Sequence, residues 1–196
     1  IHTIGDIAKT KPEFMTKWFG RSGLRLWYFA NGLDSSAVLP SDFTVPAKSI
    51  GHGITCTSDL YTDDEVWRVI LELTIDVSRK LTISGKCASG VAISVRSNKL
   101  QTKEFMCTLE SPTHNTLCIA TSAFELFRQK YDMSVPVRSI SVRAIKLVND
   151  IEAGQLSFFS EVSERDEKIE AAMKGIRERF GKKAVTYATL LQELKM

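Results

Sequence analysis

The sequence predicts an α+β domain over residues 47–150, and three observations lead to this prediction. Short segments of alternating apolar residues, the pattern of half-buried strands, lie on both sides of a long segment with apolar residues at helical spacing. A second helical segment and a last β-rich segment follow. The composition, with 43% hydrophobic and 25% charged residues in 196, excludes a disordered tail, a collagen-like repeat and a membrane channel.

The first strand is expected over residues 49–57, and a helix follows it. Thr62 and Glu65 have the T-x-x-E spacing of a capping box, in which each side chain binds the backbone N–H of the other residue. Apolar residues then recur at helical spacing, at Val66, Val69, Ile70, Leu73, Val77 and Leu81. The helix is therefore expected to bury one face.

A hairpin of two half-buried strands is predicted next, with its turn at Ser97-Asn98. Apolar residues alternate with small or polar ones in both strands: Val91, Ile93 and Val95 in the first, and Phe105, Cys107 and Leu109 in the second. This alternation turns one face of each strand toward a core.

A second helix is expected after Ser111-Pro112, and it carries Ile119, Ala120, Ala123, Phe124 and Phe127. The last strand is expected within residues 135–148. Its apolar phase slips between Val137 and Ile140, which is typical of a β-bulge. The resulting order, β-α-β-β-α-β, is that of the ferredoxin-like folds.

The domain is expected to lie between two helical extensions. Residues 1–41 have apolar residues at helical spacing, with Gly20 and Gly23 at a break between two shorter helices. Residues 42–46 are expected to form a linker. Residues 151–196 form a tail, in which an amphipathic helix follows a cap at Ser163.

Charge and cysteine content limit the function only coarsely. The net charge of +3 is too small to establish nucleic-acid binding, so any such function must depend on local pattern. The four cysteines contain no CxxC pair, which argues against a zinc site and against a disulfide scaffold. No window has the roughly 20 apolar residues of a membrane span, and we expect a reduced, soluble, cytoplasmic protein.

Motifs of catalysis and metal binding are missing from the sequence. His2, His52 and His114 are far apart and belong to no metal-binding motif, and neither a nucleophile elbow nor a phosphate-binding Gly-rich loop occurs. The acidic run at residues 63–65 could bind Mg²⁺. It also opens a predicted helix, where the helix dipole favours carboxylates, and we favour this capping interpretation. We predict no catalytic residue and no metal ligand.

Two surfaces could bind phosphate. Residues 1–8 (IHTIGDIA) place a Gly turn before a helix, where free backbone N–H groups bind anions, although an ordinary helix-joining turn has the same pattern. The outward face of the predicted sheet carries small, hydroxylic or basic residues at Ser49, Gly51, Gly53, Thr55, Ser94, Arg96, Thr108, Arg138, Ser139, Ser141 and Arg143. Such a face either binds phosphate oxygens or is simply solvated.

Base stacking is not expected on this sheet. Phe105 alternates in phase with Cys107 and Leu109, which face inward, so it is expected to face inward as well.

A separate feature is the pair of adjacent aromatics in residues 154–160 (GQLSFFS). These residues either anchor a partner protein or pack against their own domain.

These segments resemble the C-terminal part of the Y-family translesion DNA polymerases of the bacterial DinB/UmuC (ImpB/MucB/SamB) type. Residues 1–8 resemble the second half of the helix-hairpin-helix in the thumb, and residues 20–34 (GRSGLRLWYFANGLD) resemble the thumb helix after it. Residues 48–55 (KSIGHGIT), 91–98 (VAISVRSN) and 137–147 (VRSISVRAIKL) resemble strands of the little-finger domain. Residues 155–159 (QLSFF) are similar to the bacterial clamp-binding pentapeptide Q-L-S/D-L-F, with Phe158 in place of Leu.

The resemblance implies a partial thumb at residues 1–41, a linker at 42–46, a DNA-binding little finger at 47–150, and a clamp-binding motif with a C-terminal helix at 151–196. It implies DNA contacts at Thr3, Gly5, Asp6, Ser49, Gly51, Arg96, Ser97, Arg138, Ser139 and Ser141, those of the thumb turn through backbone N–H groups. It implies contacts to the sliding clamp at Gln155, Leu156, Ser157, Phe158 and Phe159. The expected partners are primer–template DNA and the clamp, and the chain is expected to be monomeric.

The resemblance also implies a parent protein that is a DNA-directed DNA polymerase, a nucleotidyltransferase acting in error-prone translesion synthesis and DNA repair. Its palm would hold two Mg²⁺ ions on acidic residues. No segment here resembles the palm motifs, and the chain begins at Ile1. We therefore expect a fragment that has no cofactor of its own and does not polymerise DNA alone.

Two other functions are compatible with the sequence. A small-molecule-binding or acylphosphatase-like protein can have the same fold, because fold does not fix function, and it would have a compact pocket with converging polar groups. A pure protein-interaction module would act through residues 155–159 and the C-terminal helix. Such a module would have no DNA affinity. DNA affinity that is retained after deletion of residues 155–196 would therefore distinguish the DNA-binding function from it.

Overall fold

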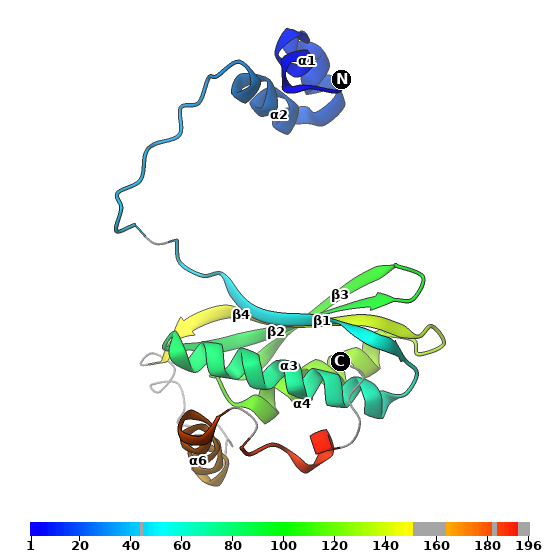
Figure 1. Cartoon of the computed structure of the whole chain (residues 1–196), viewed down its shortest axis with the longest axis vertical. Helices are drawn as coiled ribbons and strands as arrows, with labels where there is room; N and C mark the ends of the chain where they lie inside the picture. Colours follow the sequence, from blue (N-terminus) through cyan, green and yellow to red (C-terminus); the bar gives the residue numbers. More distant parts are fainter. Residues whose placement is uncertain (44, 151–163, 182–183, 192–196) are drawn as a thin grey trace. The chain divides into compact units, whose positions relative to one another are not determined.

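The computed structural model describes residues 1–43, 45–150, 164–181 and 184–191. The chain forms two compact units, Ile1–Val45 and the residues from Pro46 onward (Figure 1). Each unit has its own elements and is described by itself. Among the described residues, no helix is long and apolar enough to cross a membrane.

The first unit consists of helix α1 (Ile4–Lys9) and helix α2 (Pro12–Ala30). Helix α2 is interrupted at Gly20, whose φ of 60° and ψ of −143° lie outside the helical region. Beyond this break Gly23 packs so closely on the backbone of Met15 that a Cβ atom at position 23 would overlap the Met15 carbonyl. The predicted break between two shorter helices is confirmed.

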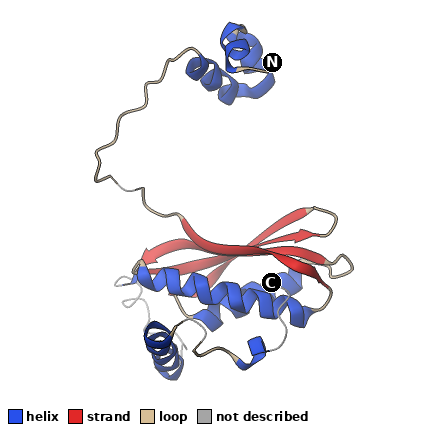
Figure 2. Ribbon diagram, in the orientation of Figure 1, coloured by secondary structure: helices blue, strands red, loops and turns tan. Residues whose placement is uncertain are grey.

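The second unit is built on a four-stranded antiparallel sheet of strands β1 (Ser49–Leu60), β2 (Lys86–Ser97), β3 (Thr102–Thr113) and β4 (Val137–Asn149), in the order β1-β4-β2-β3. Helices α3 (Asp63–Ile83) and α4 (Thr116–Lys130) lie on the same face of this sheet (Figures 1 and 2). The predicted α+β, ferredoxin-like β-α-β-β-α-β fold is confirmed.

The core lies between the sheet and these two helices. Every apolar position that predicted the first helix is buried: Val66, Val69, Ile70, Leu73, Val77 and Leu81. The hairpin contributes Val91, Ile93 and Val95, and Phe105 packs against the same core from β3. The predicted inward orientation of Phe105 is therefore confirmed.

Two local features that the sequence predicted are present, the capping box of α3 and the register slip in β4. The Thr62 hydroxyl accepts a hydrogen bond from Glu65 N, while the Glu65 carboxylate accepts from Thr62 N, so the capping box is present. In β4 the register slips at the predicted place: Ser139 faces Arg96 of β2, whereas Val137 faces Ser97, which leaves Arg138 as an extra residue. This is the geometry of a β-bulge.

The C-terminal part of the second unit contains helix α6 (Glu164–Phe180) and the short 3-10 helix η2 (Ala188–Leu191). The Thr116 hydroxyl of α4 donates a hydrogen bond to the Glu170 carboxylate of α6, and Tyr187 Oη donates to the same carboxylate over 3.3 Å. Leu190 joins the core. Ser163, the predicted cap, lies outside the described residues.

Candidate nucleic-acid interface

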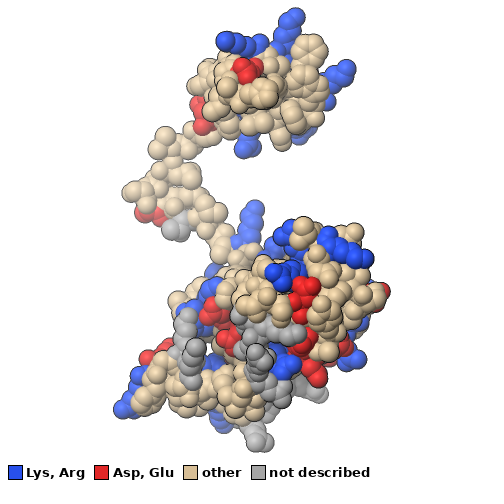
Figure 3. All heavy atoms as spheres, turned by 45° about the vertical axis from the view of Figure 1, so that its right-hand side comes forward, with Lys and Arg blue, Asp and Glu red and all other residues tan. Residues whose placement is uncertain are grey.

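The strand register brings the predicted phosphate-binding residues together on the sheet face that is turned away from α3 and α4, called here the outer face. One row across the strands contains Gly53, Ser141 and Ser94, and the next contains Thr55, Ser139 and Arg96. Their neighbours along each strand, such as Ile140 and Ile93, point into the core. Figure 3 shows basic side chains gathered over the sheet side of this unit, with acidic ones more frequent toward the helix side.

The glycines of β1 make room for side chains of β4. A Cβ atom at Gly53 would lie 2.7 Å from Ser141 Cβ, a distance that real Cβ atoms do not show. Gly51 has the same relationship with Arg143, its register partner. His52 lies between the two glycines and points to the opposite side, where its Nδ1 lies 3.1 Å from Asp76 Oδ2 of α3.

The arginines of the outer face differ in how they are held. Arg138 Nη1 lies 3.3 Å from Asp59 Oδ1. Arg143 forms an ion pair with Glu104 of β3. Arg96 is exposed, and among the described residues it has no ion pair or hydrogen bond through its side chain. A phosphate would therefore compete with a carboxylate at Arg138 and Arg143, but with water alone at Arg96.

The hydroxyl groups of the predicted site also differ in their availability. The Ser139 hydroxyl donates to Ile54 O over 3.0 Å, so it would have to leave that carbonyl before it could donate to a phosphate oxygen. Ser97 is only 3% exposed, and its hydroxyl accepts from Gln101 N over 3.3 Å inside the hairpin turn. Ser49 is exposed at the start of β1, opposite Ile145.

Two charged residues complete this face, and one of them, Lys146, did not follow from the sequence pattern. Lys146 has a positive φ of 52°, which breaks the alternation of β4, and its Nζ lies 2.8 Å from Thr108 Oγ1. Glu104 stands directly opposite Ser94 in the register of β2 and β3. Alternation does not predict the position of Lys146, because that position depends on a local backbone distortion. Alternation does place Glu104 outward, on the opposite side from Phe105, but its pairing with Ser94 depends on register.

The N-terminal turn is a capped helix start. Thr3 caps α1: its hydroxyl accepts from Asp6 N over 3.1 Å, and Asp6 Oδ2 accepts from His2 N over 2.9 Å and from Thr3 N over 3.0 Å. These hydrogen bonds, that from His2 first, lower the pKa of the Asp6 carboxyl group. Of the three residues predicted to bind phosphate through N–H groups, Gly5 alone has no hydrogen bond from N–H to another described residue.

Two of the three carboxylates in the acidic run at residues 63–65 make structural contacts. Glu65 Oε2 accepts from Tyr61 N over 2.7 Å, and Asp63 Oδ2 lies 3.4 Å from Arg128 Nε. Both contacts belong to the first turn of α3, where carboxylates are favoured by the helix dipole. The capping interpretation is confirmed: Glu65 completes the capping box, and Asp63 pairs with Arg128.

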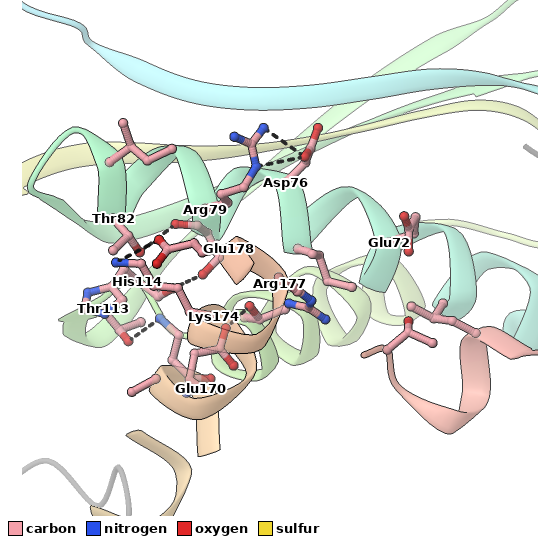
Figure 4. A pocket seen from close by; sticks show the side chains of 18 of the residues that line it. Glu72, Asp76, Arg79, Thr82, Thr113, His114, Glu170, Lys174, Arg177 and Glu178 are labelled. Carbon is pink, nitrogen blue, oxygen red and sulfur yellow. Dashed lines mark hydrogen bonds and ion pairs between the residues drawn. The ribbon is translucent and has the colours of Figure 1, made fainter. Parts of the chain in front are cut away.

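A pocket of about 980 Å³ lies on the helix side of the domain, between α3, the start of α4 and α6 (Figure 4). Several of its charged side chains bind each other: Arg79 Nη2 lies 3.2 Å from Asp76 Oδ1, and Glu170 accepts hydrogen bonds from Thr116 and Tyr187. The pocket is not part of the outer face. The predicted clamp-binding residues 155–159 lie outside the described residues.

Comparison with known proteins gives a consistent result. A model of the impB/mucB/samB family C-terminal domain matches residues 47–158. DNA polymerase IV of Acetivibrio thermocellus is 35% identical over 195 residues, covering 98% of this chain and 49% of the relative. DNA polymerase IV 2 of Halalkalibacterium halodurans is 32% identical over 191 residues, covering 96% of this chain and 46% of the relative.

A further relative has a different name. The putative UV-damage repair protein UvrX of Bacillus subtilis is 29% identical over 191 residues, covering 96% of this chain and 45% of the relative. The chain therefore spans about half the length of the curated relatives that it matches.

Proposed function

Because this chain belongs to the impB/mucB/samB family of Y-family DNA polymerases and contains the C-terminal domain of that family, we propose that it holds primer–template DNA by the phosphates and attaches to the sliding clamp. The single observation that carries the DNA-binding part is the outer face of the sheet. There Arg96, Arg138 and Arg143 lie among serines and glycines on adjoining strands, opposite the helices.

The composition of this face favours phosphate contacts over base reading. Phe105, the aromatic residue that a base-stacking sheet would expose, packs against the core. Arginine and serine side chains bind phosphate oxygens of any sequence. Binding would therefore depend steeply on salt and little on sequence, because each neutralised phosphate releases counterions.

The strength of each arginine–phosphate contact would depend on whether the arginine must first break an ion pair with a carboxylate. Arg96 has no carboxylate partner in the part of the chain that the structure describes, whereas Arg138 must leave Asp59 and Arg143 must leave Glu104. We therefore assign the leading contact to Arg96, supported by Ser141 and, once its hydroxyl leaves Ile54 O, by Ser139. Ser49 and Gly51 would add contacts along β1, whereas Ser97 is buried in the hairpin turn and would act only through the shape of that turn. In the first unit, the N–H groups of Thr3, Gly5 and Asp6 would bind the backbone through the start of α1, and Gly5 N–H would do so without breaking an existing hydrogen bond.

The clamp-binding part of the proposal rests on the QLSFF sequence at residues 155–159. Its two aromatic residues would fill an apolar pocket on the bacterial clamp, and Gln155 would make a polar contact. The parent protein would be a translesion DNA polymerase that uses Mg²⁺ held by palm carboxylates. The acidic run of this chain is engaged in capping α3 and does not fit that role.

A fluorescence-anisotropy titration of the full chain with a primer–template duplex, repeated across a salt series, tests the DNA-binding proposal. We expect Arg96→Ala to weaken binding and to lower the slope of log affinity against log salt by about one. Arg128→Ala is the matched control, because it removes the same charge from α4, on the helix side. Salt-independent affinity, or equal losses in both variants, would refute the outer face as the binding surface.

The clamp proposal needs a separate measurement. Phe158→Ala and Phe159→Ala, made together, should abolish binding of the full chain to purified bacterial clamp while leaving its affinity for the duplex unchanged. Clamp binding that survives this double substitution would contradict the assignment of residues 155–159. Loss of DNA affinity in the same variant would contradict a DNA surface separate from residues 155–159, and a full chain without DNA affinity would favour a pure interaction module.

A further inference from the structure

Three side chains from distant segments meet at one end of the sheet. Cys87 Sγ, at the start of β2, lies 3.5 Å from His114 Nδ1, between β3 and α4, and 3.2 Å from Asp150 Oδ1, just after β4. His114 Nδ1 lies 3.7 Å from Asp150 Oδ1. Figure 4 shows His114 beside Thr113 at the margin of the pocket on the helix side. A thiol, an imidazole and a carboxylate thus converge with all their donor atoms within 4.8 Å of one another.

The three separations match those of ligands around one tetrahedral ion. Zinc bonds of about 2.3 Å to sulfur and about 2.0–2.2 Å to nitrogen and oxygen, at tetrahedral angles, place the ligand atoms roughly 3.3–3.6 Å apart. The observed distances of 3.2, 3.5 and 3.7 Å surround this range. An ion therefore fits between the three atoms with shifts of a few tenths of an ångström.

The arrangement differs from that of a nucleophilic triad. In a triad the histidine uses one ring nitrogen for the nucleophile and the other for the carboxylate. Here Cys87 and Asp150 both approach Nδ1 of His114 and also contact each other. The three atoms form a small triangle, which one ion could bridge.

The backbone on which each ligand stands is fixed by neighbouring elements. Cys87 is paired with Val148 in the β2–β4 ladder. The carbonyl of His114 accepts a hydrogen bond from the Ser78 hydroxyl of α3. Asp150 N donates to Gly85 O over 3.1 Å. Such anchoring is the preorganisation that a metal site needs.

We propose that Cys87, His114 and Asp150 bind one Zn²⁺ ion, with water in the fourth position. The side chains of His114 and Asp150 are 39% and 56% exposed, so the ion can enter from solvent and keep a water ligand, while buried Cys87 supplies the inner side. Binding releases the thiol proton to solvent and leaves a thiolate on the metal.

The ligand set selects the class of ion. Thiolate and imidazole favour Zn²⁺ over Mg²⁺ and Ca²⁺, which prefer sites made of oxygen atoms alone. The cysteine pattern predicted no zinc site, because sequence motifs record ligands that are close along the chain. In this chain the ligands lie on three different segments, and only the closing of the sheet brings them together.

Metal titration of the full chain, reduced with a phosphine and freed of metal with a chelator, tests the proposal. Zn²⁺ is titrated in competition with a chromogenic chelator, and Co²⁺ is added separately to detect the near-ultraviolet charge-transfer band of a cobalt–thiolate bond. The ligand variants are Cys87→Ser, His114→Gln and Asp150→Asn. The matched controls are Cys107→Ser, which removes another partly buried thiol, and His2→Gln, which removes the exposed histidine near the N-terminus.

We expect one Zn²⁺ per chain, an affinity loss of more than about tenfold in each ligand variant, and no charge-transfer band in Cys87→Ser. Both controls should bind as the unsubstituted chain does. Circular dichroism verifies folding, and Asp150→Asn, at an exposed position, remains informative if Cys87→Ser does not fold. Absence of stoichiometric binding, a charge-transfer band in Cys87→Ser, or unchanged affinity in Asp150→Asn and His114→Gln would overturn the proposal.

Discussion

The side chain of Arg143 on β4 lies directly over the backbone of Gly51, its partner on β1. A Cβ atom at position 51 would lie 2.5 Å from Arg143 Cγ and 3.0 Å from Val142 O. The absence of a side chain at Gly51 therefore leaves room for the aliphatic part of Arg143, whose guanidinium group pairs with Glu104 of β3.

Gly51→Ala should destabilise the domain and weaken DNA binding together. Forcing a methyl group between the strands costs about 1–3 kcal/mol, and it would displace Arg143 from the position in which we propose that it meets a phosphate. Urea unfolding and anisotropy measure the two effects. Gly175→Ala in α6, where a Cβ atom meets nothing within 4 Å, is the control and should be neutral or slightly stabilising. Similar losses in both variants would contradict this account.

Asp59→Asn should strengthen DNA binding at low salt by about two- to fivefold, because it removes the carboxylate that competes with phosphate for Arg138. Asn keeps the size of the side chain and its contact with Asn98. The gain should disappear when Asp59→Asn is combined with Arg138→Ala, as a double-mutant cycle of anisotropy titrations can show. Weaker binding in Asp59→Asn would instead mean that Asp59 holds Arg138 in its binding position.

Thr62→Ala should lower the free energy of unfolding by about 1 kcal/mol, because Glu65 N loses its cap at the start of α3. Urea unfolding followed by circular dichroism measures the loss. Thr121→Ala, on the exposed side of α4, makes the same chemical change without removing a cap. Alanine is the better helix former, so this control should be neutral or stabilising. An equal loss in Thr121→Ala would show that capping is not the cause.

Stability should decline at alkaline pH through Tyr187. Burial, together with the charge of Glu170, raises the pKa of Tyr187 to about 12, whereas an unfolded tyrosine titrates near pH 10. The folded state thus binds this proton more tightly. The resulting stability is complete below about pH 10 and is lost as the pH rises toward 12.

Tyr187→Phe tests this pH dependence. At neutral pH the variant should be less stable by about 1 kcal/mol, because it lacks the hydrogen bond to Glu170. The difference should shrink between pH 10 and pH 11.5, since the variant has no phenol to ionise. Urea unfolding of both proteins across this range gives the difference directly, and a gap that stays constant with pH would contradict the raised pKa.

The sequence predicted the features that depend on local pattern. The Thr62–Glu65 box, the buried stripe of α3 and the slip in β4 before Ile140 each involve residues within a few positions of one another. In such cases propensity, periodicity and capping all favour the same local structure.

The remaining features depend on contacts between distant segments. Arg138 meets Asp59 across 79 positions, and Cys87 meets Asp150 across 63. Neither pair has a sequence signal, because the contact exists only through the strand order β1-β4-β2-β3. The positive φ of Lys146 likewise breaks a period that would otherwise have assigned the residue to the wrong face.

This strand order also affects the kinetics of folding. The last strand, β4, lies between β1 and β2 in the sheet. Ser49 of β1 and Lys86 of β2 therefore cannot pair with Ile145 and Asn149 until β4 is present, whereas β2 and β3 pair with each other as a local hairpin. Contacts that join distant parts of a chain form slowly, because a long loop must first be closed. The apolar sides of α3 and α4 therefore have only an incomplete sheet to pack against until residue 149 has been synthesised. During that interval apolar surface of both helices stays exposed, which makes the growing chain prone to aggregation.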